Sequence, residues 1–130
     1  MSIGGETVLT QKAEGGAIAA DLAVIQGTAD DQVKLPGGVG VQGKGLVALA
    51  ADAADKAIPV IISGPAVGTA GAAITAGSFV KIAGASGKLI AVGGEFALTV
   101  IEVFGIALTS AAADGDKFDV LVAPSRHVLN

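Results

Sequence analysis

Glycine and proline interrupt this chain at short, regular intervals, and this punctuation limits what the chain can fold into. Clusters of the two residues occur at positions 4–5, 15–16, 36–38, 43–45, 64–65, 68–71, 84–87 and 93–94. Both residues weaken or break helices, so no long helix fits between the clusters. The intervening segments are rich in Val, Ile, Thr and Leu, which is typical of strands bounded by turns.

The segments between the clusters predict nine strands, at residues 7–11, 22–26, 32–35, 45–50, 58–63, 79–83, 88–92, 98–108 and 118–123. Their spacing of about ten residues is typical of an all-β barrel or sandwich. Residues 17–25 carry apolar side chains at helical spacing, and residues 48–57 are rich in alanine, the best helix former. The interpretation is therefore an all-β fold, a small β-barrel, with at most one or two short helices.

Three blocks of sequence recur in the same order, which indicates an internal two-fold repeat. Residues 15–20 resemble residues 71–76, at an offset of 56. Residues 45–55 resemble 104–114 at an offset of 59, and 58–62 resemble 118–122 after a one-residue slip. We expect repeat halves at about 15–65 and 71–124. In the second half, Asp114-Gly115-Asp116 predicts a tight turn between two strands.

The composition predicts a thin core and an associated partner. Hydrophobic residues make up 52% of the 130-residue chain and charged residues only 15%, with four Phe and no Trp or Tyr. Aromatic side chains usually supply the largest burial energies. A chain with so few charges and a small core is expected to cover apolar surface by forming an oligomer or binding a permanent partner.

Charge and cysteine content exclude several classes of function. The formal net charge is −4, and the eight basic residues are spread singly, so no nucleic-acid-binding stripe is present. The absence of cysteine excludes disulfides, zinc–thiolate sites and thiol nucleophiles. Residues 57–80 are uncharged, but their prolines and glycines would break a membrane-spanning helix. The start of the chain lacks the features of a signal peptide, so none is expected.

No motif predicts catalysis, a cofactor or a metal site. The segment Gly38–Lys44 resembles a phosphate-binding loop, but Gly45 stands where magnesium binding requires Ser or Thr, and a turn precedes it. It is interpreted as a flexible loop. The aspartates at positions 30, 31, 52, 55, 114, 116 and 119 are interpreted as turn formers. His127, the only histidine, is expected in solvent or at an interface.

Three stretches, 16–30, 69–88 and 104–124, together resemble the small capsid decoration (cement) proteins of tailed bacteriophages. The resemblance covers roughly residues 15–124 and rests on strand-and-turn patterns. It implies a small barrel or tulip-like fold and a virion protein without enzymatic activity, made in the host cytoplasm. Such proteins bind the outer surface of the capsid, often as homotrimers at three-fold or quasi-three-fold positions. There they clamp neighbouring major capsid protein subunits and stabilise the shell.

The two ends of the chain supply the predicted capsid contacts. Residues 1–14 are expected to form an N-terminal arm, residues 15–124 a single domain, and residues 125–130 a C-terminal tail. In the arm, Thr7, Val8, Leu9 and Thr10 form a strand that could add to the edge of a partner sheet. In the tail, Arg126, Val128 and Leu129 are the candidate contacts. Glu102 and Phe104 are predicted at the contact between subunits.

Two other functions stay open at this point. One is a carbohydrate- or cell-surface-binding β-module, although Trp and Tyr, the usual sugar-stacking residues, are absent. The other is a nucleotide-using enzyme built around Gly38–Lys44. Neither explains the repeat or the resemblance.

Overall fold

A computed structural model describes residues 6–93 and 100–128, with backbone only for Val100 and residues 126–128. These residues form nine strands: β1 Thr7–Ala13, β2 Ala23–Gln26, β3 Gln32–Lys34, β4 Gly45–Val47, β5 Ala57–Thr69, β6 Phe79–Ile82, β7 Leu89–Ala91, β8 Val100–Ala107 and β9 Lys117–Val128. Each overlaps a predicted strand, but β5 continues through the Gly64-Pro65 cluster that was expected to end it, and β9 continues past its predicted end at residue 123. The described part contains no helix, and therefore none that could cross a membrane. The two segments with some helical character, 17–25 and 48–57, form turns and extended backbone instead. The all-β prediction is confirmed.

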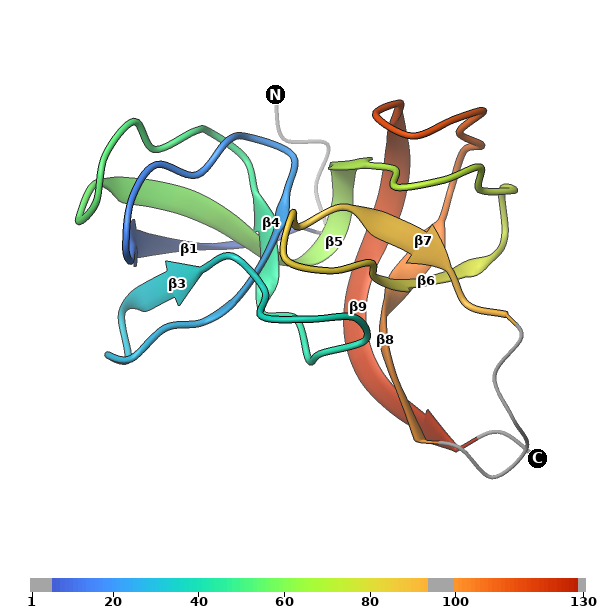
Figure 1. Ribbon diagram of the computed structural model, residues 1–130, viewed down its shortest axis with the longest axis horizontal. Coiled ribbons are helices and arrows are strands. Elements are labelled where there is room, and N and C mark those ends of the chain that lie inside the picture. The colour runs from blue at the N-terminus through green and yellow to red at the C-terminus, as the bar shows by residue number, and fades with distance from the viewer. Residues whose placement is uncertain (1–5, 94–99, 129–130) are drawn as a thin grey trace.

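The strands close into a five-stranded barrel with a second, similar unit beside it (Figure 1). The first barrel has the strand order β1-β3-β2-β4-β5, and pairing of β1 with β5 closes it. The second unit has the order β5-β9-β8-β6-β7. In the second unit, Ala70 forms a parallel bridge with Leu89. The equivalent contact in the first barrel is the parallel pair of Ala13 in β1 and Val33 in β3.

Strand pairing repeats between the two units. Val24 of β2 lies opposite Gly45 of β4, and Val80 of β6 lies opposite Gly105 of β8. At both glycines, an added Cβ would overlap a backbone carbonyl oxygen, that of Ile61 or that of Leu121. Glycine is required at these positions because the neighbouring strand approaches too closely for any side chain.

Bridges outside the strands repeat in the same way and correct the alignment of the two halves. Ile18 exchanges backbone hydrogen bonds with Ala51, and Ile74 does so with Ala111. Ile18 and Ile74 are 56 positions apart, whereas Ala51 and Ala111 are 60 apart, as are Gly45 and Gly105. The predicted offset of 59 was therefore wrong by one residue, and no slip is needed before β5 and β9.

Each unit has its own apolar core, and the two cores have matching members. The first contains Ala13, Ile18, Val24, Val33, Val47, Ala51, Ile58 and Val60. Residues at the equivalent positions of the second unit all belong to its core: Ala70, Ile74, Val80, Leu89, Ala107, Ala111, Phe118 and Val120. The second core also includes Ala23 and Leu46 from the first barrel, so the units pack against each other. The N–H of Ala23 donates a 2.8 Å hydrogen bond to the carbonyl of Gly87 across this junction.

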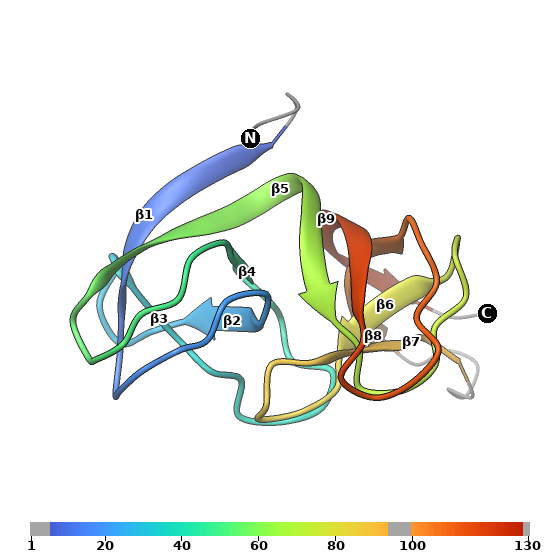
Figure 2. The same cartoon turned by 90° about the horizontal axis from the view of Figure 1, so that it is seen from above.

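Strand β5 belongs to both units. Its residues 57–63 pair with β1, and its residues 64–69 pair with β9. Figure 2 shows the strand changing direction between these two parts. Gly64, which is buried, lies at this point with φ +99°, a conformation that favours glycine.

Candidate binding surface

Residues on both sides of the bend of β5 line an apolar groove of about 480 Å³. Residues of β4 and of both parts of β5 contribute, with β1 at one side and residues from the β8–β9 region at the other. The lining residues are Glu6, Val8, Asp21, Leu46, Val47, Ala48, Pro59, Ile61, Pro65, Ala66, Val67, Leu108 and Asp119. The groove thus depends on residues from both units and on the change of direction at Gly64.

Three large aliphatic side chains of the groove are strongly exposed. Val8 is 47% exposed, Val67 41% and Leu108 47%. Leu46 and Val47, which are buried, also line the groove. Isolated exposed apolar residues are ordinary, but several that converge on one concave surface are typical of an interaction site.

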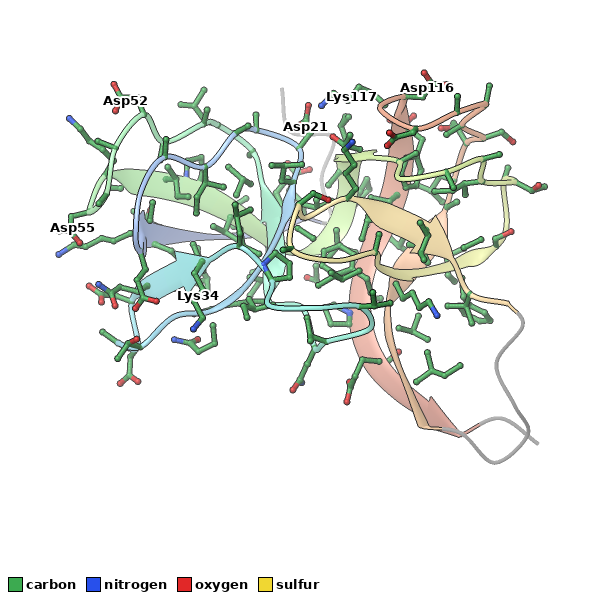
Figure 3. The ribbon with its side chains drawn as sticks, viewed as in Figure 1. Asp21, Lys34, Asp52, Asp55, Asp116 and Lys117 are labelled. Atoms are coloured by element: carbon green, nitrogen blue, oxygen red, sulfur yellow. The ribbon has the colours of Figure 1, made fainter. Side chains whose placement is uncertain are left out.

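The charged residues lining the groove are all acidic. Glu6, Asp21 and Asp119 contribute carboxylates, and none of the lysines and arginines whose side chains the structure describes lines it. Lys117 lies near one of them, with its Nζ 3.5 Å from the Asp21 carboxylate (Figure 3). In the described part of the chain, Glu6 and Asp119 have no cationic partner for their side chains. The groove is therefore apolar with an excess of negative charge.

The predicted contact residues Thr7, Val8, Leu9 and Thr10 lie in β1 and are all exposed. They do not extend away from the domain as an arm, because β1 pairs along its length with β5. Along the other edge of β1, β3 pairs only with Lys12 and Ala13. In the described structure the backbone edge at residues 7–10 is therefore open on one side.

The predicted contacts of the C-terminal tail lie partly outside the described residues. Leu129 is outside them, and for Arg126 and Val128 the structure describes the backbone alone. That backbone belongs to β9, where Arg126 pairs with Glu102 and Val128 with Val100.

The two predicted subunit contacts differ in their surroundings. Glu102 is partly exposed on β8. Phe104 is 1% exposed and belongs to the core of the second unit, where its ring lies against Gly43. The prediction that Phe104 contacts another subunit was wrong, because its side chain is buried in the core of this chain.

The glycine-rich segment that resembled a phosphate-binding loop is a connection between β3 and β4, with no helix after it. Its lysine, Lys44, donates hydrogen bonds from Nζ to Gln11 Oε1 at 2.7 Å and to Gln26 Oε1 at 2.6 Å. A phosphate loop needs a helix N-terminus and a lysine directed at the phosphates. The geometry therefore does not support the nucleotide-enzyme hypothesis.

The aspartates predicted as turn formers lie in or beside turns except Asp119, for which the prediction was wrong because this residue lies in β9 and pairs with Val67 of β5. Asp116 Oδ2 accepts hydrogen bonds from the N–H groups of Ala112 and Ala113, and Gly115 beside it has φ +90°. Asp55 occupies the equivalent turn of the first unit with φ +63°. Within the described residues, no three His, Asp or Glu side chains converge in a way that could hold a metal ion.

One carboxylate holds the β2–β3 turn in place. Glu14 Oε1 accepts a 2.8 Å hydrogen bond from the N–H of Thr28. Hydrogen bonding by Thr28 lowers the pKa of the Glu14 carboxyl below its ordinary value, with a smaller contribution from the charge of Lys34. The ionised carboxylate therefore accepts this hydrogen bond more strongly than the protonated form would.

Comparisons with known proteins identify a fold but no sequence family. No family model and no curated protein matches the sequence. The structure is similar to the crystal structure of the N base of head fiber gp8.5 in bacteriophage phi29, with a TM-score of 0.66. The match covers 92% of this chain and 95% of that chain, at 16% sequence identity. At this identity the likeness shows that the two chains share a fold.

Proposed function

We propose that this protein is a non-enzymatic structural component of a phage virion that binds the outer surface of the capsid and stabilises it. The observation that carries the proposal is the fold shared with a phage head fiber base over nearly the full length of both chains. The sequence resemblance to capsid decoration proteins points independently to the same location. The exposed apolar groove gives such a protein a surface for a partner.

Stabilisation would come from clamping neighbouring major capsid protein subunits. The proposed assembly is a homotrimer at three-fold or quasi-three-fold positions. A three-fold ring closes a heterologous interface and covers apolar surface that a small core leaves exposed. Many copies on one shell would strengthen individually weak contacts through multivalency. Glu102 remains a proposed contact between subunits.

Capsid contact is proposed at the open edge of β1 and at the end of β9. Residues Thr7–Thr10 present an exposed strand edge, to which a strand of a partner could add. Arg126, Val128 and Leu129 would contribute from the C-terminal end. Residues 7–10 pair with β5 along their other edge, so contact at the open edge would leave the barrel pairing intact.

The test measures binding to capsids assembled from the cognate major capsid protein. Wild-type protein is expected to co-sediment with the capsids, and its mass in solution or on the shell is expected to correspond to a trimer. The variant Leu9→Asp is expected to bind about tenfold more weakly, because it places a charge at the proposed strand contact. Leu9 is 38% exposed and does not line the groove.

The matched control is Leu49→Asp, which places the same charge on a leucine that is 67% exposed elsewhere on the surface. This control should bind as wild type does, and both variants should melt within about 2 °C of wild type. Absence of wild-type binding to capsids would refute the proposed function. Equal binding by both variants would refute only the contact at β1.

A further inference from the structure

We propose that the groove over the bend of β5 binds an extended polypeptide segment that carries small aliphatic side chains and at least one lysine or arginine. The inference rests on the proposed function in one respect, namely that the segment belongs to the major capsid protein. Three properties of the groove support it: its apolar side chains, its charge and the strands that line it.

The apolar part of the groove suits aliphatic side chains of a protein rather than a small ligand. Val8, Val67 and Leu108 are each between 41% and 47% exposed, so their outer surfaces face solvent. Sites for small molecules bury most of the ligand surface within a cavity. Open apolar patches on a concave surface are instead typical of protein interfaces, where a few aliphatic or aromatic anchors supply most of the binding energy.

The charge of the groove selects a basic partner. Glu6 and Asp119 place two carboxylates among the lining residues, in addition to the Asp21 carboxylate that Lys117 approaches. An acidic segment would meet like charges there and gain no compensating contact. A lysine or arginine would gain an ion pair and be guided to the site by the field of these carboxylates.

The lining of the groove favours an extended segment. Its residues come from strands β1, β4, β5 and β9 and the segments beside them, and most of its apolar side chains are small. An extended segment directs alternate side chains to one side, so it can insert two or three small ones along the groove. The lining extends from Val8 of β1 to Asp119 of β9, which suits a segment lying across the strands.

The first experiment tests the groove without a capsid. Full-length protein is applied to an immobilised positional-scanning library of extended hexapeptides. The expected result is selection for Lys or Arg together with Val, Leu or Pro, and selection against Asp and Glu. Leu108→Asp should abolish the selection, and Asp119→Lys should remove the preference for basic residues. Leu49→Asp, outside the groove, should preserve both.

The proposal would be overturned if Leu49→Asp lost the peptide selection as Leu108→Asp does. It would also be overturned if the wild-type protein selected acidic peptides or selected no sequence at all. All variants are first compared with wild type by thermal melting, and a variant that melts early is replaced by Val67→Asp, which probes the same groove.

The second experiment separates this proposal from the proposed function. The same variants are tested for co-sedimentation with capsids. If the groove binds the capsid protein, Leu108→Asp and Asp119→Lys should each lose about tenfold in affinity while Leu49→Asp does not. If all variants bind capsids as tightly as wild type does, the groove is not the site of capsid binding, and the proposed function still stands. Peptide selection without capsid binding would support the groove and refute the capsid as its partner.

Discussion

Replacing Phe104 by alanine is the sharpest test of how this fold is held together. The ring is 1% exposed and belongs to the core cluster that Leu46 of the first barrel also enters. Phe→Ala substitutions in cores cost about 3–5 kcal/mol, because they remove buried surface and leave a cavity. Gly43, against which the ring lies, has no side chain with which to fill that cavity. We therefore expect a cost within this range.

The corresponding change in melting temperature follows from the length of the chain. Unfolding entropy is about 2.1 cal/mol/K per residue, which is roughly 0.27 kcal/mol/K for this chain. A loss of about 3–5 kcal/mol should then lower Tm by ~11–18 °C. Differential scanning calorimetry measures this shift, and light scattering on the same samples measures the mass of the assembly.

The matched control is Leu49→Ala, on a side chain that is 67% exposed. It should cost less than about 0.5 kcal/mol, and Tm should change by about 2 °C or less. Suppose that Phe104→Ala left Tm within about 4 °C of wild type and instead reduced the mass of the assembly. The ring would then contact another subunit, and the assignment of Phe104 to the core would be refuted.

Two further predictions concern single contacts. Gly105→Ala should destabilise the protein by about 1–3 kcal/mol, because the added methyl group overlaps the Leu121 carbonyl oxygen, whereas Gly84→Ala, which meets open space, should be nearly neutral in urea unfolding. Glu14→Gln keeps an oxygen that can accept the hydrogen bond from the N–H of Thr28 but removes the negative charge, so it should lower stability slightly at neutral pH. Because folding lowers the pKa of Glu14, its contribution is present above the ordinary carboxyl pKa and is lost as pH falls through the folded value. Melting curves of wild type and variant should therefore converge in acid, and a constant difference down to the lowest pH would contradict this role.

The local features of the fold could be predicted from the sequence because they depend on local chemistry. Each strand lies between turn-forming residues, and Asp114-Gly115-Asp116 forms the turn its residue types demand. The alanine content of segment 48–57 allowed a helix, but the segment is extended at Ala51, where it pairs with Ile18. Propensity alone does not contain that distant partner.

The candidate site could not be predicted, because it depends on a change of strand direction. The groove exists where β5 turns at Gly64 and brings Val8 and Leu108 to one surface. Nothing in the run of residues 57–69 distinguishes one bent strand shared by two units from two separate strands. The role of Phe104 was missed for a similar reason, since burial against Gly43 requires the packing of both units.

Because β5 belongs to both units, the two units can complete their strand pairing only one after the other during synthesis. All five strands of the first barrel lie before residue 70, so this barrel has its complete set of partners before the second unit has been translated. Residues 64–69 must then wait for residues 117–122, which emerge some fifty positions later. Pairings of such separation are slow to form, and a nascent strand edge is open to wrong partners meanwhile. Ala23 and Leu46, which the second unit covers in the finished molecule, stay in contact with water during that interval.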